Sequence, residues 1–315
     1  MCAINKFKTG EKIMLVTTAP HMLIQDDTRK IMWSVNMALV PAFLMSLYFF
    51  GLGAFLITIT SIITCCLTEY LCCLIMKKEN SIFDGSAVLT GILLAFNLPS
   101  NIPLWMVAIG GVVSIAVVKM LFGGLGCNIF NPALVGRAFL LACYPVAMTT
   151  WPIPRAMAGI TGPTPLGIVK EKLTVALPGY WDLFIGNHGG SLGETSALFL
   201  LLGGAFLLFR KIITWHIPVS FIGTAALLFW IFGGKGWFNG DPLFAILTGG
   251  IMLGAIFMAT DLVTSPLTKK GQLIFGCGIG VLTCLIRLKG GYPEGVSYSI
   301  LIMNTTVPLI DRYIK

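Results

Sequence analysis

The sequence predicts an all-α integral membrane protein, and three observations support this fold class. Hydrophobic residues make up 56% of the 315 residues and charged residues only 11%, whereas a soluble domain carries about 25% charged residues. The mean hydropathy is +0.89, and apolar segments close to the roughly 20 residues that a bilayer needs recur along the chain. The 36 glycines suit close helix packing and broken helices within a membrane.

The apolar segments divide the chain into four parts. Residues 1–30 are basic and polar, which predicts a cytoplasmic N-terminal segment and no signal peptide. Residues 31–150 form a first membrane half, 151–195 a long connecting loop, and 196–315 a second membrane half. About ten spans are expected, at 31–50, 52–76, 84–100, 103–121, 130–149, 196–209, 213–232, 242–259, 272–288 and 295–311.

The formal net charge of +8 indicates membrane orientation rather than nucleic-acid binding. Basic residues of membrane proteins collect on the cytoplasmic side. If the spans alternate from a cytoplasmic N-terminus, most of the 21 Lys and Arg residues fall in cytoplasmic segments. This predicts cytoplasmic N- and C-termini and an extracytoplasmic loop 151–195.

Two of the expected spans resemble each other. Ala87–Gly91 reads AVLTG and Ala245–Gly249 reads AILTG, and each span begins at an Asp beside a Gly. Thr-Gly in mid-span suggests that both helices are broken or re-entrant. Five spans in each half would make the second half enter from the opposite face, which is an inverted repeat with binding sites expected near its Gly-interrupted helices. Chance similarity between two apolar helices is the alternative.

A few polar residues fall at or near membrane depth, where they are costly and therefore functional candidates. Glu69 and Arg137 lie within spans, and Asp84 and Asp241 open the two similar spans. These two aspartates are either helix caps or part of an ion path, because acidic residues favour helix N-termini. Asp261 closes the eighth span and is either in the ion path or a loop anchor.

The stretch from Gly123 to Pro132 (GGLGCNIFNP) has the composition of a ligand site. Gly124 and Gly126 allow close approach of a backbone to a ligand. Asn128 and Asn131 offer amide donors and acceptors that suit a planar heterocycle with a hydrogen-bonding edge. A tight turn capped by asparagine explains the same residues without a ligand.

Conventional catalytic and metal motifs are absent from the sequence. It contains no HExxH, no P-loop and no GxSxG motif, and its three histidines are scattered. We therefore expect no catalytic residue of these kinds and no metal site. Four of the nine cysteines fall in one apolar helical stretch, where packing is expected and a cluster or redox pair is the alternative: Cys65, Cys66, Cys72 and Cys73.

Four blocks together resemble one known family. They are the TTAPH start at Thr17–His21, Phe122–Phe139 (FGGLGCNIFNPALVGRAF), Gly190–Ser196 (GSLGETS) and Ala259–Pro266 (ATDLVTSP). The chain is similar to the RnfD/NqrB family, membrane subunits of ion-translocating electron-transfer complexes, and in length it is more like RnfD. The resemblance covers nearly the whole chain and implies a multi-pass protein of the bacterial inner membrane.

The resemblance also implies two flavins. In this family, flavin mononucleotide (FMN) is attached through its phosphate to the last threonine of an S/T-G-A-T motif. Here Thr161-Gly162-Pro163-Thr164 occupies that place, so Thr164 is the implied site, Thr161 the fallback and an unmodified turn the alternative. Pro163 replaces the usual Ala and fixes the backbone there. The second, non-covalent flavin of the family is riboflavin, which we assign to Gly124, Gly126, Asn128 and Asn131.

The function implied by the resemblance is a redox relay, active only as part of an ion-translocating ferredoxin:NAD oxidoreductase. Its implied partners are other Rnf subunits, including a second covalent flavoprotein subunit and an NADH-side subunit, a flavin transferase and membrane lipid, but no nucleic acid. Electrons would pass from ferredoxin through FMN and the membrane flavin toward NAD, coupled to Na+ or H+ movement. The alternatives are a solute or ion channel or transporter with inverted repeats, and a structural subunit without a cofactor.

Overall fold

The computed structural model describes residues 28–78, 81–154, 161–194, 196–234, 236–291 and 294–314. These residues form helices and connecting loops, with one isolated β-bridge between Pro152 and Thr161 and no strand in the described ranges. This confirms the all-α prediction. Most of the predicted N-terminal segment 1–30, with Thr17–His21, lies outside the described residues.

The helices of the first half coincide with the five spans expected there. Proline at the first helical position begins α5 and α6, where its missing N–H costs no helical hydrogen bond. The bounds are α1 (Thr28–Phe50), α2 (Leu52–Met76), the 3₁₀ turn η1 (Ile82–Asp84), α3 (Ser86–Phe96), α4 (Leu104–Val112), its π-helical continuation η2 (Val113–Met120), α5 (Pro132–Cys143) and α6 (Pro145–Thr149).

The connecting loop contains two short helices, and the second half again has a helix at each expected span. The loop helices are α7 (Pro165–Lys170) and α8 (Tyr180–Ile185). The others are α9 (Ala197–Phe209), α10 (His216–Phe232), α11 (Pro242–Leu247), α12 (Ile251–Leu253), the π-helical η3 (Gly254–Met258), α13 (Lys269–Lys289) and α14 (Val296–Tyr313).

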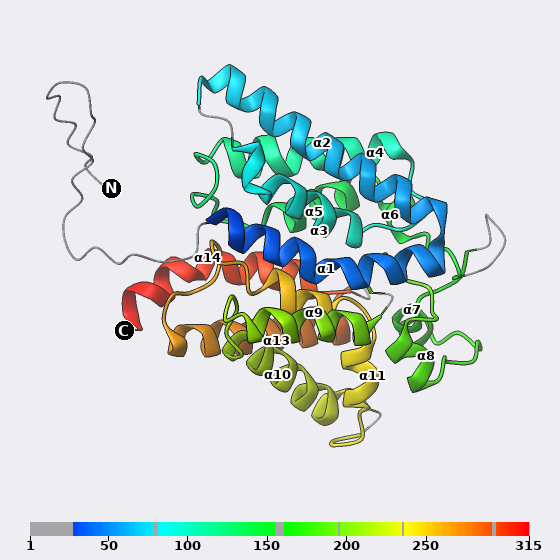
Figure 1. Ribbon diagram of the computed structural model, residues 1–315. Coiled ribbons are helices and arrows are strands. Elements are labelled where there is room, and N and C mark those ends of the chain that lie inside the picture. The colour runs from blue at the N-terminus through cyan, green and yellow to red at the C-terminus, as the bar shows by residue number, and fades with distance from the viewer. Residues whose placement is uncertain are drawn as a thin grey trace, which may run out of the picture.

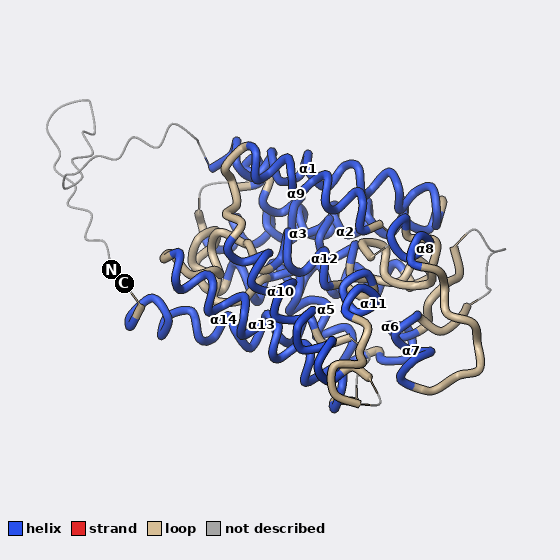
Figure 2. Tube along the Cα trace, turned by 90° about the horizontal axis from the view of Figure 1, so that it is seen from below, coloured by secondary structure: helices blue, strands red, loops and turns tan. Residues whose placement is uncertain are grey.

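Helix α1 lies between the two groups of helices (Figure 1). It contacts α2 and α3 of the first half and α9 of the second, while α5 contacts α14. Within the halves, α2 packs on α3 and α4, and α10 packs on α11 and α13. The loop helices α7 and α8 lie at the end of the molecule opposite the end of α14, as two perpendicular views show (Figures 1 and 2).

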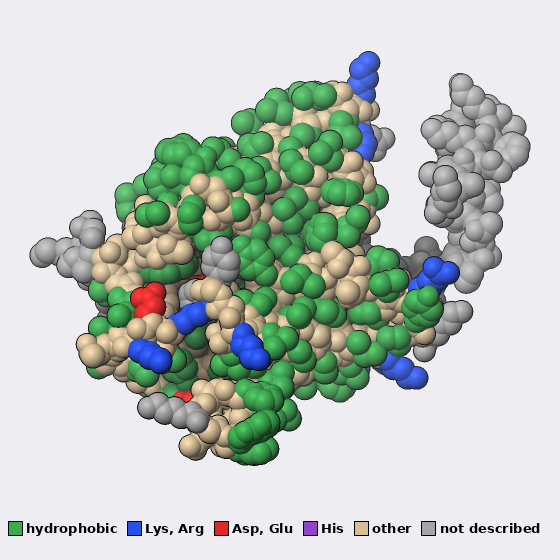
Figure 3. Space-filling model, turned by 180° about the vertical axis from the view of Figure 1, so that it is seen from behind, with side chains coloured by type: hydrophobic (Ala, Val, Ile, Leu, Met, Phe, Trp, Pro, Cys, Tyr) green, Lys and Arg blue, Asp and Glu red, His purple; other side chains and the backbone are tan. Residues whose placement is uncertain are grey.

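The surface is that of a membrane protein. Helices α1, α2 and α13 are long and apolar enough to cross a bilayer, and several shorter apolar helices accompany them. Large apolar side chains such as Leu52, Ile75 and Phe209 are exposed, and Figure 3 shows a largely hydrophobic face with charged side chains toward its edges. Exposed apolar area of this extent needs a covering phase, which the hydrocarbon of a bilayer supplies.

The two similar spans, expected to be broken or re-entrant, differ in the structure: only the second is interrupted at its Thr-Gly pair. Helix α3 runs without interruption through Thr90 and Gly91, while the second-half span is broken at Thr248 and Gly249 as expected. Gly249 has φ +69°, a left-handed conformation, whereas Gly91 packs tightly within a regular helix. Helix α3 has 11 residues, about 16 Å at 1.5 Å per residue, or roughly half of the hydrocarbon core.

Candidate cofactor-binding sites

Thr164 begins helix α7. Its side-chain oxygen accepts a hydrogen bond from the Gly167 N–H at 3.1 Å, and Pro165 follows at the first helical position. Threonine before proline is a common helix start because the hydroxyl satisfies a free N–H while proline supplies the helical φ. The side chain is only 6% exposed. Thr164 is therefore held in one orientation by the turn that follows it.

A cavity of about 320 Å³ opens beside Thr164. Its walls come from α5, α6, the start of α7 and the start of α14. Arg137 and Glu294 form an ion pair in its wall, and Trp151 supplies an aromatic ring. We call it the Thr164 cavity. It combines apolar, charged and hydroxyl side chains, the hydroxyls being those of Thr149, Thr164, Ser297 and Tyr298.

The other residues of the T-G-P-T stretch support this loop rather than line the cavity, with one exception. Thr161 is exposed and pairs with Pro152 in the isolated bridge, and the Gly162 N–H donates to the Trp151 carbonyl at 2.9 Å. The exception is Pro163, which lines the cavity with Thr164. Of the two predicted threonines, the structure brings only Thr164 to a cavity wall.

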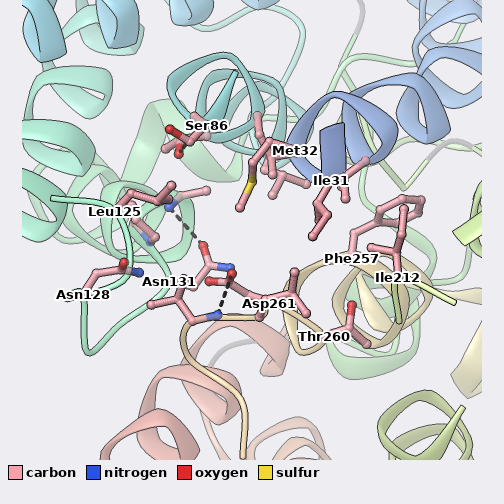
Figure 4. Close-up of a pocket in the computed structure, with 18 of the residues that line it drawn as sticks. Ile31, Met32, Ser86, Leu125, Asn128, Asn131, Ile212, Phe257, Thr260 and Asp261 are labelled. Carbon is pink, nitrogen blue, oxygen red and sulfur yellow. Dashed lines mark hydrogen bonds between the residues drawn. The ribbon is translucent and has the colours of Figure 1, made fainter. Parts of the chain in front are cut away.

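A second, smaller cavity of about 70 Å³ lies at the start of α5. Asn128 and Asn131 both line it, as Figure 4 shows, with Ile31 and Met32 contributed by α1. The Asn131 oxygen accepts from the Ala133 N–H at 3.1 Å, so Asn131 caps α5. We call it the Asn131 cavity. The structure thus combines the two sequence interpretations, because the capping asparagine is also a cavity residue.

The two glycines of this block have a conformational role. Gly124 and Gly126 have φ of +106° and +89°, which side chains rarely adopt, and a Cβ at either would meet nothing within 4 Å. They are required by the turn between η2 and α5. Leu125, between them, is the residue that reaches the cavity.

The three aspartates proposed for an ion path have different surroundings. Asp84 does not cap α3, because Gly85 occupies that position without a side-chain bond. Asp241 does cap α11, accepting from the Phe244 N–H at 3.0 Å, and it also accepts from the Tyr180 hydroxyl. The hydrogen bond to the carboxylate raises the pKa of Tyr180.

Asp261 is both a loop anchor and a wall residue of the Asn131 cavity. Its carboxylate accepts from the Val263 N–H at 3.3 Å and the Thr264 hydroxyl at 3.1 Å (Figure 4 shows Asp261 beside Asn131). Burial raises the pKa of this carboxyl, and the two hydrogen bonds oppose the shift. Of the three aspartates, Asp261 alone lines a predicted flavin site.

Glu69 and Arg137, the two charged residues expected within spans, each belong to a buried ion pair. Lys119 lies 2.7 Å from Glu69 and 2.8 Å from the Ser86 hydroxyl, and both charged side chains are almost fully buried. Arg137 pairs with Glu294 and donates to the Asn97 side chain at 2.9 Å. Each pair joins helices of different sequence position, so Glu69 and Arg137 are internally neutralised rather than free.

Lys119 and Arg287 are interior residues that sequence reasoning missed. Counting charges puts them in loops on opposite membrane faces, whereas the structure buries both. Arg287 donates to the Ala245 and Thr248 carbonyls at 2.8 and 3.0 Å. The signal was present, since Lys119 and Arg287 each stand just before a Gly-Gly pair, one in each half of the chain.

The sequence matches a known family over almost its whole length. A family model described as the NQR2, RnfD, RnfE family matches residues 15–315. The chain belongs to this family. The match covers both candidate cavities and every helix bounding them, so it does not rest on a single motif.

Individual relatives agree with the family assignment. The chain is 50% identical over 314 residues, covering 96% of this chain and 95% of the relative, to a protein of Clostridium ljungdahlii named as the D-type subunit of a proton-translocating ferredoxin:NAD(+) oxidoreductase complex. It is 45% identical over 308 residues, covering 97% and 95%, to an Acetobacterium woodii protein named as the D-type subunit of a Na(+)-translocating ferredoxin:NAD(+) oxidoreductase complex. The D-type subunit of an ion-translocating oxidoreductase complex of Stutzerimonas stutzeri is 38% identical over 326 residues, covering 92% and 91%.

Proposed function

We propose that this protein is the D-type membrane subunit of an Rnf-type complex and carries FMN esterified to Thr164. The family and the names of its relatives support this role. The observation that carries the covalent site is the Thr164 cavity, because the threonine at the end of the T-G-P-T stretch lies in the wall of a space of about 320 Å³. Ligand cavities typically measure about 300–1000 Å³.

The residues present fit an esterified phosphate at Thr164. The threonine oxygen is used only as an acceptor, from the Gly167 N–H. Esterification removes the hydroxyl proton, which no described residue accepts, and leaves an oxygen that still accepts. Arg137 lies in the same wall but is already paired with Glu294, so the fit to an esterified phosphate rests on the Thr164 oxygen. A flavin bound there supplies electron-transfer chemistry, while these residues position it and set its electrostatic surroundings.

We assign the second flavin, riboflavin, to the Asn131 cavity, which would have to widen from about 70 Å³ to admit the ring. Apolar side chains from α1 and η3 form part of its walls, with Asn128, Asn131 and Asp261 on one side and Ser86 across from them (Figure 4). A planar ring with an edge of donors and acceptors needs both apolar contacts and such polar groups. The side-chain amides of Asn128 and Asn131 provide both donor and acceptor atoms.

The proposed role in the complex follows from these two sites. Electrons originating at ferredoxin reach the flavin on Thr164 from a second covalent flavoprotein subunit and continue through the Asn131 cavity toward the NADH-side subunit. A flavin transferase attaches the FMN, and the loop 151–195 faces the extracytoplasmic side of the bacterial inner membrane. The transported ion is Na+ or H+, both of which occur in the names of relatives.

We further propose that the two membrane halves form an inverted repeat. Equivalent helices pack equivalently: α2 contacts α3 and α4, and α10 contacts α11 and α13. The first helices of the two halves, α1 and α9, contact each other, as do the last, α5 and α14. Contacts between like elements are what a two-fold relation produces. The lipid-facing exposure of α1, α2 and α13 fits a multi-pass arrangement.

The covalent site is tested by flavin fluorescence of the denatured protein on a gel, after production together with the flavin transferase. We expect a fluorescent band for wild type and for Thr161→Ala, and none for Thr164→Ala. Thr161→Ala is the matched control because it removes a hydroxyl from the same loop, at an exposed position outside the cavity. An unlabelled wild type, with another transferase substrate labelled in parallel, would contradict the proposal and favour a channel or transporter.

A further inference from the structure

Unpaired buried polar atoms gather in one region of the protein. Among the described residues, eight buried side-chain polar atoms have no hydrogen-bond partner by distance and angle, and three of them are Nε2 of His188, Oε1 of Glu194 and Nε of Arg287; a fourth, the Ser191 hydroxyl, lies close enough to the Glu194 carboxylate to lower its pKa. Buried polar atoms are nearly always paired, so each exception calls for a physical reason. His188, Glu194 and Arg287 are 5–7% exposed, so bulk solvent does not account for them.

The segment His188–Glu194 is locked into the helices around it. The Leu192 N–H donates to the Leu98 carbonyl at 3.1 Å and the Gly193 N–H to the Phe96 carbonyl at 2.7 Å, which joins the segment to the end of α3. A Cβ at Gly193 would lie 2.6 Å from the Phe96 Cβ. The backbone therefore has no room to move, and the unpaired side chains are held in place.

Glu194 faces the break between α11 and α12. A Cβ at Gly250 would lie 3.5 Å from the free Glu194 Oε1. On the other side, a Cβ at Gly190 would lie 2.9 Å from Glu194 Oε2 and 3.7 Å from His188 Cε1. Glu194 Oε2 therefore lies on the side of Gly190 and His188, while the unpaired Oε1 faces Gly250 and the break between α11 and α12.

This region borders the Thr164 cavity. A Cβ at Gly189 would lie 3.6 Å from the Pro152 carbonyl and 3.9 Å from the Pro163 carbonyl, so the segment touches the loop that carries Thr164. Arg137 and Glu294, whose charges act on Glu194, themselves line that cavity. A charge change in the cavity is therefore felt at Glu194 through a low-dielectric interior.

The charged groups facing Glu194 come from three further elements. They are Arg137 of α5, Arg287 of α13 and Glu294 before α14, with His188 on its own segment. Burial, reinforced by Glu294, raises the pKa of Glu194 to about 7, and the two arginines oppose the shift. Burial lowers the pKa of His188, so the imidazole is neutral and can accept or relay a proton.

We propose that Glu194 is a proton-exchanging carboxylate that takes up a proton when the flavin on Thr164 is reduced. This rests on the proposed function, because it requires a flavin in the Thr164 cavity. One electron from the neighbouring flavoprotein subunit enters the flavin, and one proton from extracytoplasmic water enters Glu194. Before reduction, the charges of Arg137 and Arg287 balance those of Glu194 and Glu294. The added electron and proton then leave the net charge of the region unchanged.

The direction of the pH dependence follows from the charge. Negative charge on the flavin favours the protonated form of Glu194 and so raises its pKa above the value in the oxidised protein. Proton uptake on reduction therefore occurs above about pH 7. In that range the midpoint potential of the tethered flavin falls with rising pH more steeply than it does without a titrating group at position 194.

The test combines a redox titration with infrared difference spectroscopy on the purified complex, reduced with dithionite, in water and deuterium oxide. Wild type is expected to gain a carboxylic-acid C=O band on reduction, with a deuterium shift. Glu194→Gln is expected to lose the band and to have a shallower potential–pH slope. Asp182→Asn is the matched control: this carboxylate lies in the same loop, on α8, but does not line the Thr164 cavity, and the variant should behave as wild type.

The outcomes separate this inference from the function on which it rests. A normally fluorescent Thr164 band, with no carboxylic-acid band on reduction or with the same band in Glu194→Gln, overturns the role of Glu194 alone. Loss of the covalent flavin in wild type overturns the proposed function instead. If Glu194→Gln does not assemble, Glu194→Asp keeps a titrating carboxylate and should keep the reduction-induced band; its absence there overturns the proposal as well.

Discussion

Lys119 and Arg287 each precede a Gly-Gly pair, one in each half of the chain, but they have different partners. Lys119 stands four residues before Gly123 and Arg287 three residues before Gly290. Lys119 lies in the π-helical segment η2, and a π-helical turn takes one more residue than an α-helical turn, which accounts for the difference. Lys119 binds the carboxylate of Glu69, whereas Arg287 binds two backbone carbonyls.

The difference between these cations explains why α3 is continuous while the corresponding span of the second half is broken between α11 and α12. At Gly249 the chain turns left-handed and frees the Ala245 and Thr248 carbonyls, which the planar guanidinium of Arg287 satisfies together. Non-helical backbone at membrane depth is tolerated only where its polar groups find such partners. In the first half Gly91 packs against the backbone of Ile62, so α3 stays regular.

The largest expected effect comes from Lys119→Met, which leaves Glu69 buried without its cation. We expect a loss of about 3–5 kcal/mol in the free energy of unfolding, because an uncompensated buried charge is costly. Unfolding of the detergent-purified protein measures it, with the exposed Lys270→Met as control. Combining Lys119→Met with Glu69→Leu should recover most of the loss; a single variant as stable as wild type would break the comparison.

Arg287→Lys sharpens the comparison because it replaces the guanidinium of the second half with an ammonium, the kind of cation that Lys119 provides in the first half. An ammonium reaches one of the two carbonyls less well and leaves the other unpaired, so we expect a loss of about 1.5–3 kcal/mol, the range for a hydrogen bond to a charged group. The reciprocal Lys119→Arg keeps the charge beside Glu69 and serves as the matched exchange. Equal stability of wild type and Arg287→Lys would show that the broken helix does not need a guanidinium.

Gly249→Ala tests the break itself and has the smallest expected effect. A side chain in the left-handed region costs about 1–2 kcal/mol, and the new Cβ would lie 2.5 Å from Arg287 Nη2 and 2.7 Å from Leu166 Cδ1, so both side chains would have to move. Gly250→Ala is the control, since its φ is −71° and its Cβ makes only an ordinary contact at 3.5 Å. Thermal unfolding that ranks the two variants equally would contradict a strained turn at Gly249.

Much of the fold could be predicted because apolar length and proline position are local properties. The expected span 52–76 matches α2, and Pro132 begins α5 where the sequence indicated. Asn131 and Thr164 both cap helices, and short polar side chains before proline are a local signal for caps. The break at Thr248 was likewise visible from Thr-Gly in an apolar run.

The charged interior could not be predicted in the same way, because it depends on which helices meet. Nothing local to Lys119 distinguishes it from a loop lysine; its burial follows from Glu69, 50 residues earlier in the chain. Glu194 was seen only as part of the GSLGETS block, and its neighbours Arg137 and Arg287 come from helices far away in sequence. The Thr-Gly match also misled at Gly91, where packing against α2 keeps the helix regular.

The central claim is that the protein holds two flavins in two separate cavities. The flavin content of the purified complex tests it most directly. Flavin that stays with the denatured chain is measured separately from flavin that acid extracts. Wild type is expected to hold both. Thr164→Ala should lose only the retained flavin, and Asn128→Leu, which alters the wall of the Asn131 cavity, should lose only extractable flavin. Retained flavin in Thr164→Ala, or loss of the same flavin from both variants, would contradict this arrangement.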